Sequence, residues 1–181
     1  MYDTNALRKI LTQIWTEKIS LAYASGRISS EATLVAELYR YIKKYSLYNV
    51  WLEHRINLPE DKKSGPFDIL ITDNLNIIGA IEVKFFPGNQ KKYKKDLKKL
   101  VSITKITTDT HLRTNPISGE WDENYIYKVI KNPLCVFAVI GYSDLEALYI
   151  KNIPNNILHL TGTVSSGKCE FCQRHPVSAH T

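Results

Sequence analysis

Three charged residues lie within two otherwise apolar stretches of this chain. The stretches span residues 66–71 and 77–86, and their content of β-branched and aromatic residues predicts two β-strands. Asp68 lies in the first stretch, and Glu82 and Lys84 lie in the second. A charge inside a strand that is apolar on both sides is costly unless it is paired or binds a metal ion. The two strands therefore indicate either an ion-pair cluster or a chemical site.

The segment between the two stretches predicts that they form a β-hairpin. Residues 73–76 contain one aspartate and two asparagines, which favour turns. If the hairpin is symmetric about Leu75, Asp68 lies directly opposite Glu82, with Cβ atoms about 5 Å apart. Alternation along the second strand places Lys84 on the same face as Glu82. Two carboxylates that close repel each other, and a hard cation with a preference for oxygen ligands, such as Mg²⁺, would relieve the repulsion.

These residues resemble the motif of the PD-(D/E)XK nuclease superfamily, which has the restriction-endonuclease-like fold. Residues 66–68 match its Pro-Asp pair with one residue inserted, and residues 82–84 match its (D/E)XK element. The resemblance covers about residues 28–142, in the order helix, strand, strand, strand, helix, strand. The apolar residues 134–140 predict the last of these strands. The resemblance implies an α/β fold with a central mixed β-sheet flanked by helices.

The same resemblance implies a metal-dependent nuclease that hydrolyses phosphodiester bonds, with DNA as the expected substrate. Asp68 and Glu82 would bind Mg²⁺ or Mn²⁺, with the Val83 carbonyl as a further ligand. Lys84 would position the attacking water or stabilise the developing negative charge. Two other functions stay open: a nucleic-acid-binding module of this fold that does not cleave, and a protein-interaction subunit. A structural salt-bridge cluster is the simpler interpretation of these residues, but it accounts less well for the second acid.

Superfamily members commonly carry a glutamate on the helix before the sheet, and two residues compete for this position here. Apolar periodicity predicts a helix over residues 30–45. Glu31 falls within its apolar stripe, whereas Glu37 falls at the edge, so we favour Glu31 as an additional catalytic acid. An acid in the first turn also complements the helix dipole, which is the alternative role of Glu31. Glu53 is a weaker candidate, for which a surface ion pair is the simpler interpretation.

A lysine-rich segment follows the predicted hairpin. Six lysines lie within residues 90–100, in a helix predicted over residues 90–102. Such a density of ammonium groups can neutralise phosphates along a nucleic-acid backbone, although a solvated helix face is the alternative. The lysines expected to bind nucleic acid are Lys91, Lys92, Lys94 and Lys95.

The C-terminal residues contain potential zinc ligands. Cys169 and Cys172 have the CxxC spacing of one half of a structural zinc site, and His175 follows them. Because the chain has no second CxxC pair, two thiols without a metal are the simpler interpretation. A Zn²⁺ ion at these three residues is the alternative.

Length and composition favour one nuclease-like domain over residues 1–181, with its core at about 28–142 and a C-terminal extension at 155–181. The net charge of +6 suits a polyanionic partner such as DNA. No apolar run approaches the roughly 18 residues of a membrane span, so no membrane contact is expected. The N-terminus has no signal-peptide pattern and the three cysteines are too few for a disulfide scaffold, so the expected location is cytoplasmic. The sequence leaves the oligomeric state open, and a dimer is compatible with it.

Overall fold

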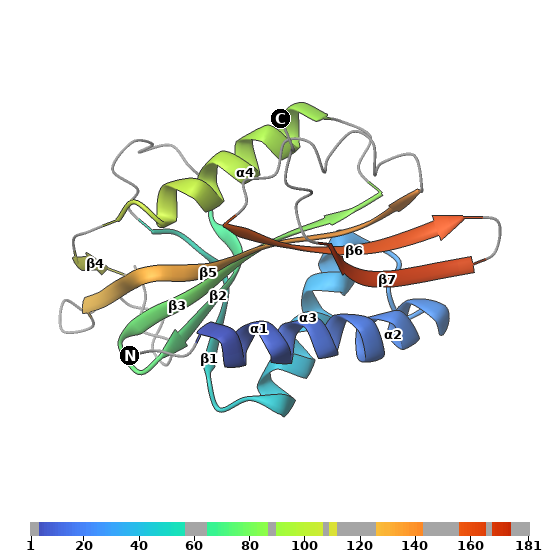
Figure 1. Cartoon of the computed structure of the whole chain (residues 1–181), viewed down its shortest axis with the longest axis horizontal. Helices are drawn as coiled ribbons and strands as arrows, with labels where there is room; N and C mark the ends of the chain where they lie inside the picture. Colours follow the sequence, from blue (N-terminus) through green and yellow to red (C-terminus); the bar gives the residue numbers. More distant parts are fainter. Residues whose placement is uncertain are drawn as a thin grey trace, which may run out of the picture.

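A computed structural model describes residues 4–56, 65–86, 90–106, 109–111, 126–142, 156–165 and 168–174. These residues form a mixed α/β fold in which helices cover both faces of one β-sheet (Figure 1). The predicted class, a mixed sheet flanked by helices, is confirmed at this level.

The N-terminal helices form the layer on one face of the sheet. Their bounds are α1 (Thr4–Gln13), the π-helical segment η1 (Ile14–Ile19), α2 (Ser20–Ala24) and α3 (Glu31–Tyr45). α3 begins after Ser30, whose hydroxyl accepts a hydrogen bond from the Thr33 N–H in a capping box. Its buried residues Leu34, Leu38 and Ile42 recur every four positions and face the sheet. No helix of the described residues is long and apolar enough to cross a membrane.

Within the described residues the sheet contains seven strands, six of which lie in the order β1-β2-β3-β5-β6-β7. Their bounds are β1 (Asn49–His54), β2 (Phe67–Asp73), β3 (Asn76–Phe85), β4 (Asp109–His111), β5 (Ile126–Tyr142), β6 (Ile157–Ser165) and β7 (Lys168–Arg174). β2 is antiparallel to both β1 and β3, whereas β5 is parallel to both β3 and β6. β7 is antiparallel to β6, and the short β4 pairs with the start of β5.

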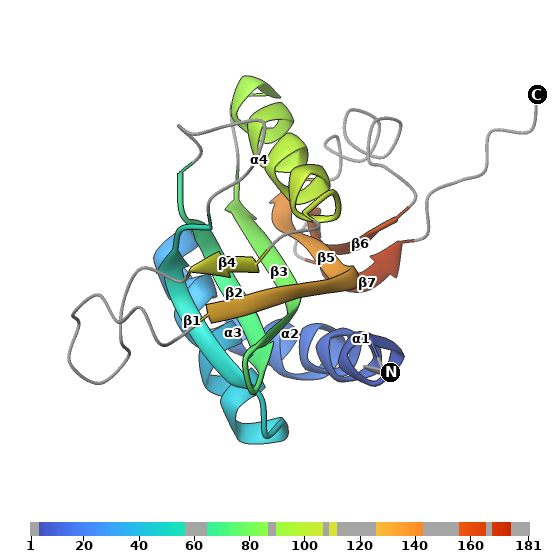
Figure 2. The ribbon, with the colours of Figure 1, turned by 90° about the vertical axis from the view of Figure 1, so that its left-hand side faces the viewer.

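The second helical layer is α4 (Gln90–Ile103), which lies on the face opposite α1–α3 (Figure 2). Parallel strands cannot be joined by a tight turn, and α4 lies in the connection from β3 to β5. The alternating side chains of β3 are divided between the two layers. Ile81 and Val83 are buried with α1 and α3, whereas Ala80 is buried with the apolar residues of α4. From Ala80 onward, even-numbered positions of β3, including Glu82, therefore lie on the α4 face.

The β2–β3 hairpin has the predicted register next to its charged residues. Ile69 pairs with Ile81, so one step further along each strand Asp68 comes opposite Glu82. The turn is tighter than the symmetric one expected, because only two residues separate the last paired positions. A β-bulge farther along adds the one residue that restores the predicted register before the charged positions are reached.

β6 and β7 continue the sheet beyond β5, within the region regarded as a C-terminal extension. The Trp15 Nε1–H donates a hydrogen bond to the Thr161 carbonyl oxygen at 2.9 Å. The Trp15 ring also packs against Phe171, with 5.6 Å between ring centroids. These two strands therefore share a core with the N-terminal helices.

Candidate active site

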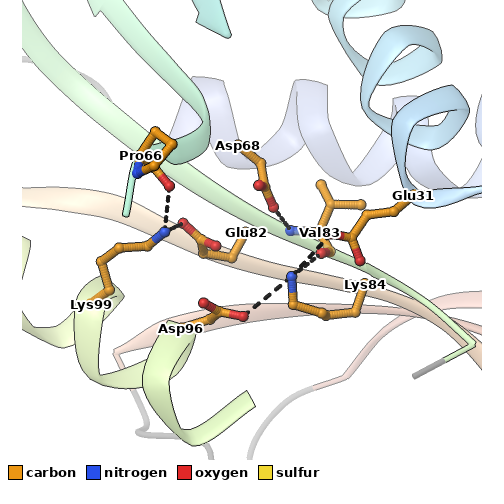
Figure 3. A network of polar contacts seen from close by, with 8 residues as sticks. All are labelled: Glu31, Pro66, Asp68, Glu82, Val83, Lys84, Asp96 and Lys99. Atoms are coloured by element: carbon orange, nitrogen blue, oxygen red, sulfur yellow. Dashed lines mark hydrogen bonds and ion pairs between the residues drawn. The ribbon is translucent and has the colours of Figure 1, made fainter. Parts of the chain in front are cut away.

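Charged side chains from four elements meet near the C-terminal end of β3 (Figure 3). We call them the charged cluster. Its members are Glu31 from α3, Asp68 from β2, Glu82 and Lys84 from β3, and Asp96 and Lys99 from α4.

The two predicted metal-binding acids are held by different partners. The Asp68 Oδ2 atom accepts a hydrogen bond from the Val83 N–H at 2.7 Å, which ties this side chain to the neighbouring strand. Glu82 is only 1% exposed, and its Oε1 atom lies 2.6 Å from the Lys99 Nζ atom. Both acids therefore have restricted orientations, and each keeps an oxygen that these contacts do not use.

Lys84 links the two helical layers through its ammonium group. Its Nζ atom lies 3.4 Å from the Glu31 Oε1 atom and 3.2 Å from the Asp96 Oδ2 atom, on helices that cover opposite faces of the sheet. The same group donates a hydrogen bond to the Val83 carbonyl oxygen at 2.7 Å. The contact with Asp96 places Lys84 on the α4 side together with Glu82, as strand alternation predicted.

Burial destabilises the charged forms of both acids. Burial and, after it, the negative charge of Asp68 raise the pKa of Glu82 to about 8, against the opposing effect of the Lys99 ammonium. Burial also raises the pKa of Asp68, against the opposing effects of the Val83 N–H and the Lys84 charge. An additional cation near both carboxyl groups would favour their ionised forms.

Lys84 stays charged despite its burial. Desolvation alone lowers the pKa of its ammonium group, but the negative charges around it, led by that of Asp96, outweigh this effect. The net shift raises the pKa above the usual value of lysine. At neutral pH Lys84 is therefore a donor and a positive charge, not a general base.

Of the two glutamates considered on the helix, Glu31 is the one that reaches the charged cluster. Glu37 instead pairs with Arg40, with 2.7 Å between its Oε2 atom and the Arg40 Nη2 atom, and its Oε1 atom lies 3.8 Å from the Arg27 Nε atom. The helix periodicity that favoured Glu31 therefore agrees with its position beside Lys84.

A cavity of about 550 Å³ opens beside Asp68, between α3 and β1. It is lined by Glu31, Ala32, Val35, Ala36, Leu52, Glu53 and Asp68. Glu53 has a φ angle of 52°, which is uncommon for a residue other than glycine. Glu53 makes no ion pair with another of the described residues. Glu53 lines the same cavity as Asp68.

Sequence reasoning did not predict Asp96 or Lys99 as site residues, although the position of Asp96 in the apolar stripe of α4 could have indicated it. Tyr93 and Leu100 are buried, and Asp96 lies three positions after the first and four before the second. That spacing places Asp96 within the apolar stripe, where an acid requires a partner. Lys99 lies at the edge of the same stripe, and its 7% exposure distinguishes it from the solvated lysines of α4.

The structure describes the side chains of two of the four lysines predicted to bind nucleic acid. Lys94 and Lys95 are exposed on α4. The side chains of Lys91 and Lys92 lie outside the described residues.

The predicted zinc ligands cannot be assembled from the described side chains. The Cys172 Sγ atom lies 3.2 Å from the Thr161 Oγ1 atom, whereas His175 and the side chain of Cys169 lie outside the described residues. In the part of the chain that the structure describes, no group of three or more His, Cys, Asp or Glu side chains is arranged to hold a metal ion. A metal at the charged cluster would thus need main-chain, water or substrate oxygens besides Asp68 and Glu82.

Comparisons of the chain with protein-family models, with curated proteins and with solved structures find no match.

Proposed function

We propose that this chain is a metal-dependent nuclease of the PD-(D/E)XK superfamily, with the restriction-endonuclease-like fold, and that it hydrolyses phosphodiester bonds in DNA. The observation that carries the proposal is the meeting of Glu31, Asp68, Glu82 and Lys84, which come from three separate elements. The element order α3-β1-β2-β3-α4-β5 supports it, because it is the order that the resemblance implies, with β4 as a short addition.

The donor chemistry of Asp68 and Glu82 fits a hard divalent cation. Mg²⁺ usually keeps several waters and takes one or two carboxylates together with substrate phosphate oxygens. Asp68, Glu82 and the Val83 carbonyl would hold Mg²⁺ or Mn²⁺ here, and the positive charge would relieve the unfavourable proximity of the two acids. When bound, such an ion supplies an acidified water and offsets charge on the scissile phosphate.

Other groups of the site would position the reacting atoms and the metal ligands and would stabilise the developing negative charge. Lys84 is charged at neutral pH, so it donates hydrogen bonds to the attacking water or to the phosphate oxygen on which charge develops. Glu31 orients Lys84 through their ion pair and, at 47% side-chain exposure, is open to water on the cavity side. The Val83 N–H holds Asp68 in place through their hydrogen bond.

Cleavage of supercoiled plasmid DNA tests this function. We expect wild-type protein to nick or linearise the plasmid with Mn²⁺ or Mg²⁺ and to leave it intact with EDTA, because the buried acids require a cation. Gel electrophoresis of the plasmid forms over time measures the rate. The nuclease proposal is wrong if no DNA or RNA is cleaved with either ion and calorimetry detects no metal binding.

A nucleic-acid-binding module that does not cleave is the second candidate. The 2.6 Å contact between the Lys99 Nζ and Glu82 Oε1 atoms favours it, since an internal ammonium stabilises the ionised form of this buried acid without a metal. This candidate predicts DNA binding with neither metal binding nor cleavage, so the plasmid and calorimetry experiments distinguish the two.

The exposed lysines of α4 are expected to contact the DNA backbone. Replacing Lys91, Lys92, Lys94 and Lys95 with glutamine should weaken DNA binding regardless of sequence. The slope of log affinity against log salt concentration should become shallower by about 0.9 for each phosphate that the variant no longer neutralises. Fluorescence anisotropy with labelled duplexes at several salt concentrations measures this slope.

The matched control changes exposed lysines on another helix. Lys43→Gln with Lys44→Gln removes charge from the end of α3 and should leave the slope near that of the wild type. An unchanged slope in the α4 variant would assign those lysines to a solvated helix face.

A further inference from the structure

Lys99 is held on several sides at the base of the charged cluster (Figure 3). Its Nζ atom lies 2.6 Å from the Glu82 Oε1 atom and donates a hydrogen bond to the Pro66 carbonyl oxygen, also at 2.6 Å. The ammonium also lies 4.9 Å from the centroid of the Phe67 ring. With 7% exposure, this lysine has few alternative positions, and its contact with Glu82 is part of the packing of α4 on β2 and β3.

A second contact between α4 and β3 fixes the position of the first one. Glu82 and Lys84 are two positions apart on a strand, a separation of roughly 6.6 Å. Asp96 and Lys99 are three positions apart on a helix, a rise of about 4.5 Å, which is close to the spacing of the two strand residues. Asp96 contacts Lys84 and Lys99 contacts Glu82, so the order of the contacts along the helix is opposite to that along the strand. The pair of contacts prevents α4 from shifting along β3 without breaking both.

The contact with Lys99 engages one of the two carboxylate oxygens of Glu82 and leaves the other for a metal ion. Oε1 faces the ammonium, so Oε2 is the oxygen left for an ion shared with Asp68. A carboxylate that offers a single oxygen suits the near-octahedral shell of Mg²⁺ at 2.0–2.1 Å. Ca²⁺ is larger, takes six to eight oxygens and often uses both oxygens of one carboxylate.

We propose that Lys99 determines the metal specificity of the site, by holding Glu82 in a single-oxygen mode that favours Mg²⁺ over Ca²⁺. The inference rests on the proposed function, because it takes Glu82 as a metal ligand. Lys99 also repels any cation, but Mg²⁺ and Ca²⁺ carry the same charge. The ratio of the two affinities therefore isolates the effect of the oxygen mode from that of the charge.

The test compares metal affinities of Lys99→Met with those of the wild type. Methionine is similar in length and cannot donate a hydrogen bond, so both Glu82 oxygens become available. Binding of Mn²⁺ alone is followed by the electron paramagnetic resonance of the free ion, and Mg²⁺ and Ca²⁺ are then added as competitors. We expect the Ca²⁺-to-Mg²⁺ affinity ratio to rise about tenfold, because bidentate coordination favours the larger ion.

Two further variants make the result specific. Lys98→Met makes the same change at the neighbouring exposed lysine and should leave the ratio unchanged. Lys99→Arg keeps the charge but offers a planar fork that engages both carboxylate oxygens. It should weaken binding of Mn²⁺ and Ca²⁺ alike by at least about tenfold, which tests whether residue 99 controls the Glu82 oxygens even if Lys99→Met does not fold.

The outcomes separate this inference from the function on which it rests. If wild-type protein binds Mn²⁺ but both Lys99 variants keep its affinities and its ratio, Lys99 does not set specificity and the nuclease proposal stands. If wild-type protein binds no Mn²⁺, the metal site and the role of Lys99 are both overturned.

Discussion

Asp68→Asn and Glu82→Gln are each expected to lower the rate of metal-dependent plasmid cleavage by at least about 100-fold. Each change keeps the shape of the side chain and removes a charge that a hard cation requires. Lys84→Ala should have an effect of similar size, because it removes a positive charge beside the position where negative charge develops. Initial rates from gel densitometry at saturating Mn²⁺ measure these effects, with circular dichroism as the check on folding.

Metal-free DNA binding is the internal control for these three variants. It should persist in all of them, because Lys94 and Lys95 remain exposed on α4. If the Asp68→Asn and Glu82→Gln variants fold well and cleave DNA as fast as the wild type, neither acid takes part in the mechanism.

A matched pair on α3 tests the third acid. Glu31→Gln should impair cleavage, because its carboxylate lies 3.4 Å from the Lys84 ammonium. Glu37→Gln should have a mild effect, since this residue pairs with Arg40 and Arg27. The opposite pattern would transfer the role to Glu37.

Glu82→Gln is also expected to change how stability depends on pH in the absence of metal. The pKa of Glu82 is about 8 in the folded protein and near the ordinary 4.5 when the chain is unfolded. Between these values the folded state holds a proton that the unfolded state releases. The free energy of unfolding therefore falls as pH rises through this window, by up to about 1.4 kcal/mol per pH unit from this one group.

Glutamine resembles the protonated form of Glu82 and does not titrate. Near pH 5, where Glu82 is protonated in the folded protein, the variant should be about as stable as the wild type. At pH 8 to 9 it should exceed the wild type by on the order of 3–5 kcal/mol, and the falling slope should largely disappear. The raised pKa of Asp68 leaves a smaller dependence of the same sign.

Urea unfolding with EDTA at intervals from pH 5 to 9 measures this effect. Glu170→Gln changes an exposed glutamate on β7 and should keep the wild-type dependence on pH. If Glu82→Gln and the wild type show parallel curves, the Glu82 carboxyl is not destabilised by burial. Added Mn²⁺ should stabilise the wild type more at pH 8 than at pH 5, because binding favours the ionised carboxylate.

Local patterns in the sequence predicted the part of the site that lies on one hairpin. The alternation of β2 and β3 and the turn between them depend on residues close in the chain, so they predicted that Asp68 faces Glu82 and that Lys84 shares the face of Glu82. The turn is tighter than expected, and the β-bulge compensates for this difference. Apolar periodicity likewise predicted α3, and a continuous apolar run predicted the central part of β5.

Contacts between elements distant in the chain were decided only by the tertiary structure. Glu31 meets Lys84 across 53 residues, and no local pattern determines which face of α3 reaches the end of β3. Asp96 and Lys99 became members of the site because α4 packs on β3 with its charges in complementary order. β6 and β7 joined the sheet through pairing with β5 and through the contacts of Trp15. Helix and strand periods show which residues share a face, whereas packing between layers selects the partners of that face.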